Sequence, residues 1–187
     1  MRNFIFYNYF NEQMMNLITE QSIIYASQKD KVFLTNVEEF KKFISIIIKM
    51  GIFRFLTYNK HWQDRYRMDC ITQIISRNKF KEWMSFLHFA DRSKTPSAKD
   101  PIYKIRDISE MFRANCSRFP AEECQSIDEI MIPFKGKTHL KRYLPNKPNK
   151  WGLKLFARAS KRGFLHNFFM NDGTEIIAEK TTNRVLF

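Results

Sequence analysis

The spacing of hydrophobic residues changes once along this chain, near residue 124, and that change limits the fold more than any other feature. Before it, apolar residues recur every three or four positions, as in the run Met14, Leu17, Ile18, Ile24 and Tyr25. That spacing predicts amphipathic helices with one buried face. After residue 124, short segments alternate apolar and polar residues, a period typical of strands. The chain is therefore predicted to be mixed α+β, with a helical N-terminal part followed by strands.

Three further helices are predicted before the change in period. One begins at a capping signal, either Thr35 with Glu38 or Asn36 with Glu39, and ends at Gly51. Its predicted buried face carries Phe40, Phe43, Ile44, Ile47 and Ile48. The other two helices, separated by a Pro- and Ser-containing loop at 91–101, carry the sets Phe80, Trp83, Met84, Leu87 and Ile105, Ile108, Phe112, Cys116, Phe119. We interpret these aromatic and methionine stripes as core.

Strands are predicted in the last third of the chain. The segment SIDEIMIPF is short and β-branched, and in the following run Leu153, Leu155, Ala157 and Ala159 alternate with Lys154, Phe156, Arg158 and Ser160. Lys161-Arg162-Gly163 then predicts a hairpin turn before a further strand, FLHNFFMN, which ends at the turn signal Asn171-Asp172-Gly173.

Cysteine usage and hydropathy exclude several classes of protein. The three cysteines, Cys70, Cys116 and Cys124, have no CxxC spacing, so we predict reduced, mostly buried thiols and no zinc site. The longest apolar runs are far too short to span a bilayer, and the N-terminus lacks the features of a secretory signal. An intracellular soluble protein is expected, with neither a membrane nor a small-molecule substrate as partner.

Positive charge is concentrated in one segment. The formal net charge is +13, and residues 130–171 contain ten Lys and Arg with no Asp or Glu. These basic residues are Lys135, Lys137, Lys141, Arg142, Lys147, Lys150, Lys154, Arg158, Lys161 and Arg162. A field of this kind favours a polyanionic partner, because every neutralised phosphate releases counterions. A solvated surface face remains the alternative.

The same segment resembles a known family. Residues 126–154 read SIDEIMIPFKGKTHLKRYLPNKPNKWGLK, which is similar to the signature IDE-x-M-x-PFKGR…YxPxKPxKWGxK of piggyBac-type transposases. Four earlier segments resemble other parts of that family in the same order: EEFKKFISIIIKMGI, HWQ, SRNKFKEWMSFLHFAD and DPIYKIRDI. The resemblance extends from about residue 10 to residue 173.

The resemblance implies a cut-and-paste DNA transposase. Residues 1–122 would form a helical dimerisation and DNA-binding module, and 123–187 the first strands of an incomplete RNase H-like α/β domain. Asp128 corresponds to the first of three catalytic aspartates, which hold Mg²⁺. The residues expected to bind DNA are Lys135, Lys137, Lys141, Arg142, Lys147, Lys150 and Lys154. The family also implies action in the nucleus.

The matched catalytic set is incomplete. In the family the second and third aspartates lie downstream, and the later acids Asp172, Glu175 and Glu179 do not resemble their motifs. Two-metal chemistry needs several carboxylates. Glu129 is expected on the opposite strand face from Asp128, in an orienting role.

Three functions are therefore predicted. In the first, the chain is a fragment, or a domesticated or decayed copy, that binds DNA without transposing it. In the second, it is an active transposase whose missing aspartates come from a longer gene product. In the third, it is an interaction module that pairs with itself or with a full-length transposase. Among single residues, Trp151 is read as core rather than as a stacking platform for a base, and His139 and His166 as surface or packing residues.

Overall fold

In the computed structural model, the chain forms two compact units, and each is described here by itself. The structure describes residues 2–91, 93 and 100–170. We call Phe10–Thr95 the helical unit, and Met1–Tyr9 together with Pro96–Phe187 the sheet unit. None of the helices in the described ranges has the length and apolarity needed to cross a membrane.

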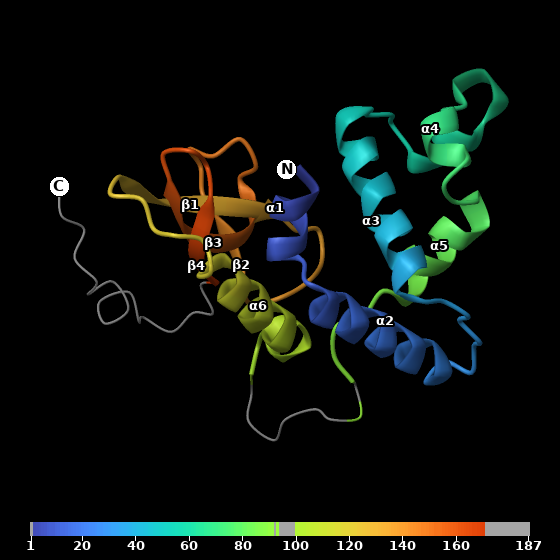
Figure 1. The fold of residues 1–187 in the computed structure, drawn as a ribbon, viewed down its shortest axis with the longest axis horizontal. Coiled ribbons are helices and arrows are strands. Elements are labelled where there is room, and N and C mark those ends of the chain that lie inside the picture. The colour runs from blue at the N-terminus through green and yellow to red at the C-terminus, as the bar shows by residue number, and fades with distance from the viewer. Residues whose placement is uncertain (1, 92, 94–99, 171–187) are drawn as a thin grey trace. The chain divides into compact units, whose positions relative to one another are not determined.

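The helical unit packs around aromatic residues. It contains α2 (Glu12–Ser27), α3 (Val37–Ile52), the short 3-10 helices η1 (Tyr58–Trp62) and η2 (Asp64–Tyr66), α4 (Asp69–Thr72) and α5 (Arg77–Phe86) (Figure 1). Trp83 is fully buried, and its ring lies 5.3 Å from that of Phe40 and 5.5 Å from that of Phe43, measured between centroids. Large buried rings of this kind supply much of a small core's hydrophobic stabilisation.

The predicted helices are present, but their buried faces differ in part from the prediction. In α3 the buried side chains are Phe40, Phe43 and Ile46, whereas Ile47 and Ile48 are exposed. Met84 of α5 is likewise exposed. The prediction was wrong at these positions because α3 is apolar on more than one side, so spacing alone did not select the face that packs.

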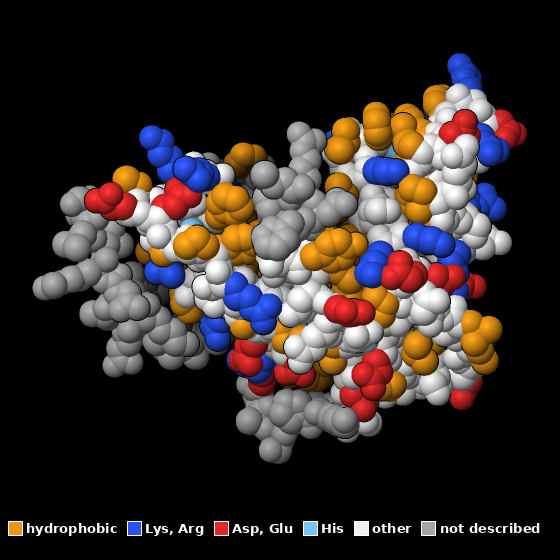
Figure 2. All heavy atoms as spheres, in the orientation of Figure 1, with side chains coloured by type: hydrophobic (Ala, Val, Ile, Leu, Met, Phe, Trp, Pro, Cys, Tyr) orange, Lys and Arg blue, Asp and Glu red, His pale blue; other side chains and the backbone are white. Residues whose placement is uncertain are grey.

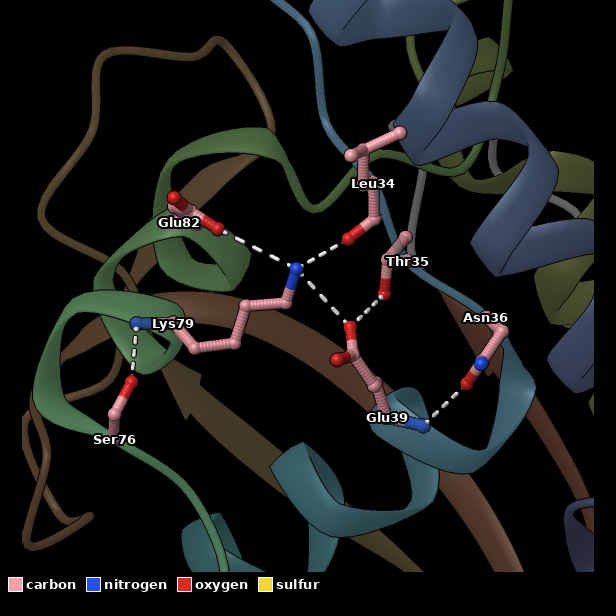
Figure 3. Close-up of polar contacts among 7 residues, drawn as sticks. All are labelled: Leu34, Thr35, Asn36, Glu39, Ser76, Lys79 and Glu82. Carbon is pink, nitrogen blue, oxygen red and sulfur yellow. Dashed lines mark hydrogen bonds and ion pairs between the residues drawn. The ribbon is translucent and has the colours of Figure 1, made fainter.

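The start of α3 has the predicted capping signal, in its Asn36 form. The Asn36 side chain accepts a hydrogen bond from the Glu39 N–H at 2.9 Å, and the Thr35 hydroxyl donates to the Glu39 carboxylate at 2.9 Å (Figure 3). Lys79 of α5 also lies 3.1 Å from that carboxylate and donates to the Leu34 carbonyl. The Asn36 side chain thus satisfies one of the free N–H groups at the start of α3, and the Lys79 contacts tie that start to α5.

The sheet unit carries an antiparallel sheet of four strands. These are β1 (Gln125–Pro133), β2 (Lys141–Tyr143), β3 (Trp151–Ser160) and β4 (Leu165–Met170). β3 pairs with β1 along one side and with both β2 and β4 along the other. The predicted hairpin between β3 and β4 is confirmed, and Gly163 in its turn has a φ of 84°, a conformation that favours glycine.

Two helices, α1 (Arg2–Tyr9) and α6 (Tyr103–Cys116), complete the sheet unit. Phe112 of α6 packs on Phe168 of β4, with 5.8 Å between ring centroids. Tyr9 of α1 stacks on Phe119 at 4.4 Å, and its hydroxyl both donates to the Leu165 carbonyl at 3.1 Å and accepts from the Leu165 N–H at 3.0 Å. The first and last described segments of the chain are thereby joined.

The mixed α+β class is confirmed, while two finer expectations are wrong. Cys116 is buried, but Cys70 and Cys124 are exposed, so the thiols are not mostly buried. Trp151 is exposed, not part of the core. The compact units place α6 with the sheet; the dimerisation and DNA-binding roles expected for 1–122 stay predictions. The turn signal at 171–173 lies outside the described residues.

Candidate nucleic-acid interface

The register of the sheet places Asp128 on a defined face. Directly opposed residues in antiparallel strands point to the same side, and alternate residues share that side. Asp128 pairs with Ala157, which pairs with Phe168, so these three side chains lie on one face. By the same register that face also carries, from β1, β2 and β3, Ile130, Ile132, Lys141, Tyr143, Trp151 and Leu153. We call it the Asp128 face.

Asp128 is open to solvent and has a cation beside it. Its side chain is 82% exposed, and its Oδ1 accepts a hydrogen bond from the Glu129 N–H at 2.7 Å. Lys147 Nζ lies 3.7 Å from the same oxygen. A carboxylate so exposed remains accessible to an incoming metal ion, and the ammonium group beside it can attract an incoming phosphate.

Lys147 reaches this position because the turn between β2 and β3 folds back toward β1. The turn is closed by a hydrogen bond from the Leu144 N–H to the Lys150 carbonyl at 2.8 Å. Lys147 Nζ donates to the Glu129 backbone carbonyl at 3.0 Å. This contact fixes a positive charge next to Asp128, although the two residues are far apart in the sequence.

Glu129 lies on the opposite face, as strand alternation predicts. It pairs with Phe156, and its carboxylate lies 2.5 Å from Lys154 Nζ. That ammonium group also sits 4.6 Å from the centroid of the Phe156 ring. The expected DNA contact Lys154 is therefore engaged by an acid and lies away from Asp128.

The other predicted DNA-binding residues are divided by the structure. Lys135 and Lys137, in the connection from β1 to β2, are exposed, as is Lys150 before β3. Lys141 is on the Asp128 face, whereas Arg142 pairs with Gly152 on the other face and donates to the His139 carbonyl at 2.9 Å. On the visible side of the sheet unit, blue Lys and Arg side chains lie among orange hydrophobic ones, with a few red acidic ones (Figure 2).

Sequence reasoning misplaced Trp151, which lies beside Tyr143 at one end of the Asp128 face. Trp151 is 57% exposed and Tyr143 is 48% exposed. The two residues are register partners, their ring centroids lie 4.9 Å apart, and Lys141 Nζ is 5.6 Å from the centroid of the Trp151 ring. The available signal was the Pro-, Asn- and Lys-rich turn between them, which predicts an exposed hairpin end and not a core.

The described residues do not fit a complete Mg²⁺ site. Mg²⁺ requires near-octahedral oxygen coordination, usually with more than one carboxylate when it serves two-metal chemistry. Within 2–91, 93 and 100–170, no group of three or more His, Cys, Asp or Glu could hold a metal ion. Asp128 and Glu129 themselves point to opposite faces. No reaction step through a metal is therefore derived from them.

Comparison with known proteins identifies the class. A family model described as "Transposase IS4" matches residues 4–184. The chain therefore belongs to this transposase family, and its similarities within the family are to piggyBac-type proteins.

Human piggyBac transposable element-derived protein 2 is 28% identical over 176 residues, and human piggyBac transposable element-derived protein 3 is 26% identical over 160 residues. The matches cover 91% and 84% of this chain, but only 29% and 27% of those relatives.

A solved structure shares the fold. The piggyBac transposase seen in a synaptic complex with hairpin DNA superposes with a TM-score of 0.79 at 20% identity. The match covers 97% of this chain and 39% of that one. The four-stranded antiparallel sheet thus fits a partial RNase H-like domain, as the sequence resemblance implies.

Proposed function

We propose that the sheet unit binds the sugar-phosphate backbone of DNA and that this chain does not transpose DNA by itself. The observation that carries the proposal is the run of ten Lys and Arg without an acid over residues 130–171. Its members Lys135, Lys137 and Lys150 have exposed side chains, and Lys147 lies beside Asp128. Contacts between these lysines and DNA phosphates would release counterions, and that release favours binding.

A salt titration tests the binding. We expect micromolar, largely sequence-independent affinity for a labelled duplex, with log affinity falling steeply as log salt rises. Changing Lys135, Lys137 and Lys150 together to Gln removes three contacts, which reduces the slope by about 3. Fluorescence anisotropy between about 50 and 200 mM salt measures both quantities.

A matched variant in the helical unit provides the control. Lys31, Lys42 and Lys81 are also exposed, and changing all three to Gln alters the net charge by the same amount. The proposal expects this control to keep the wild-type slope. Equal losses in both triple variants would mean that binding is not confined to the basic tract of the sheet unit, either because net charge drives it or because residues 1–122 bind DNA as the family resemblance implies.

The absence of independent transposition is part of the same proposal. We infer that Asp128 supplies one carboxylate of a Mg²⁺ site to which other carboxylates must be added, because Glu129 points to the other face and is paired with Lys154. The proposal includes action in the nucleus, where tagged protein should accumulate.

A second candidate is an active transposase in which a longer product supplies further carboxylates. It is favoured by the length of the human relatives, of which this chain spans less than a third. Reading the transcript beyond the Phe187 codon discriminates, since an in-frame strand ending in an Asp-Asn pair would support activity. Pairing with another copy or with a full-length transposase stays a prediction, measurable by light scattering of the mixture.

A further inference from the structure

We propose that Trp151 and Tyr143 form a stacking platform for an unpaired base of a DNA strand. This inference rests on the proposed DNA binding. It specifies that the bound DNA has unpaired bases and is not duplex alone. The two rings, register partners on β3 and β2, are 57% and 48% exposed. Exposed aromatic rings next to a cationic groove are the usual means of holding single strands without sequence preference.

The chemistry around the platform selects a nucleic acid over an apolar partner. Lys141 Nζ lies 5.6 Å from the centroid of the Trp151 ring, and the residue before Trp151 is the exposed Lys150. A base stacked on Trp151 would bring its own phosphates to these ammonium groups. A protein partner that buried the same rings would have to desolvate both lysines, at a cost in free energy.

The position of the platform connects it to Asp128. Both lie on the Asp128 face, and Trp151 is six residues along β3 from Ala157, the register partner of Asp128. At about 3.3 Å per residue, the separation is about 20 Å. A B-form duplex covers that distance in about six steps of about 3.4 Å each, and a more extended unpaired strand covers it in fewer. A strand that passes Asp128 with its backbone can therefore place an unpaired base on Trp151.

Isoleucine side chains bridge this distance. Ile130 and Ile132, on β1 between the two sites, are 47% and 41% exposed. They offer an apolar surface for sugars and base edges, while Lys147 holds the positive charge at the Asp128 end. The Asp128 face is thus apolar in the middle, with the cation Lys141 at the Trp151 end and the Asp128–Lys147 ion pair at the other.

The intrinsic fluorescence of the full chain gives a direct readout. Of the three tryptophans, Trp83 is buried and Trp62 donates its indole N–H to the Ile75 carbonyl, so Trp151 is the most solvent-exposed emitter. We expect a thymidine oligomer of about 16 nucleotides to quench this emission on binding. The same oligomer with abasic sites should bind more weakly and leave the emission unchanged. In Trp151→Phe the quenching component should disappear.

Affinity measurements separate stacking from charge. Trp151→Ala should weaken binding of the oligomer roughly 5- to 150-fold, the range expected for one stacked base, with the salt slope and duplex affinity unchanged. Tyr143→Ala should act in the same direction. The control is Tyr66→Ala, because Tyr66 is an exposed ring with Lys60 at 5.2 Å and Arg65 at 5.7 Å in the helical unit. It should bind as wild type.

Several outcomes would overturn the platform. If wild-type emission is not quenched, or if Trp151→Ala binds single strand and duplex with the same change in affinity, the rings do not stack a base. A protein-concentration-dependent shift of the emission without DNA would mean that a second copy covers the rings. Loss of stacking with duplex binding intact removes only the platform, whereas absence of all DNA binding removes the proposed function as well.

Discussion

Tyr9→Phe is the perturbation for which the structure makes the sharpest stability prediction. The Tyr9 hydroxyl makes two hydrogen bonds with the backbone of Leu165, one as donor at 3.1 Å and one as acceptor at 3.0 Å. Each hydrogen bond contributes about 0.5–1.5 kcal/mol net, and leaving the Leu165 groups without a partner costs more where water cannot reach them. The ring, stacked on Phe119, is kept by phenylalanine. We expect a loss of about 2 kcal/mol from the free energy of unfolding.

Urea denaturation measures this loss. With a slope of about 2 kcal/mol per molar, the midpoint should fall by about 1 M. Tyr143→Phe is the control, because the Tyr143 ring is half exposed and the same hydroxyl is removed. A Tyr9→Phe midpoint equal to that of the control would refute the view that α1 is held to β4 through this hydroxyl.

The burial of the Tyr9 hydroxyl also makes the stability of the protein depend on pH. Burial raises the pKa of Tyr9 above its ordinary value of 10.0, so the folded state favours the protonated hydroxyl. The corresponding stability is present below that ordinary value and is lost as the pH rises through the raised pKa. Tyr9→Phe should lack this alkaline loss, which urea titrations at increasing pH would detect.

Two further predictions concern the packing of the strands and the thiols. A Cβ added at Gly152 would lie 2.2 Å from the Ile132 backbone oxygen, so Gly152→Ala should destabilise the protein by about 1–3 kcal/mol in urea titrations. A Cβ added at Gly51 would meet nothing within 4 Å. Gly51→Ala should therefore stabilise α3 by about 0.5–1 kcal/mol. Equal effects of the two substitutions would contradict this reading. Burial raises the pKa of the Cys116 thiol to about 11, so a disulfide-exchange reagent at neutral pH should label the exposed Cys70 and Cys124 rapidly and Cys116 only on unfolding. Rapid labelling of all three thiols in the native protein would show that Cys116 is not buried.

The sequence predicted the order and type of the long elements because their signals are local. The capping residues Asn36 and Glu39, and the Gly163 turn, act within a few residues of themselves, and the structure places them as expected. β2 was missed because three residues carry almost no periodic signal, and α1 was missed because the first residues of the chain have no clear apolar stripe.

The candidate site was predictable only in part, because its geometry comes from pairings distant in sequence. Asp128 was found through the family signature, and its separation from Glu129 follows from strand alternation. The approach of Lys147 to Asp128 depends on how the turn after β2 folds, which no local pattern encodes. The exposure of Trp151 was predicted wrongly because a tryptophan that opens a strand is usually part of a core. Its position at the end of a hairpin leaves it exposed to solvent.

A basic surface that carries a single metal-binding carboxylate is proposed to hold DNA without cutting it. The most direct measurement incubates the purified chain with an end-labelled hairpin oligonucleotide and Mg²⁺ or Mn²⁺, and follows retention and strand integrity in the same sample. Bound, uncut DNA is expected for both the wild type and Asp128→Ala. Metal-dependent nicking by the wild type that disappears in Asp128→Ala would contradict it.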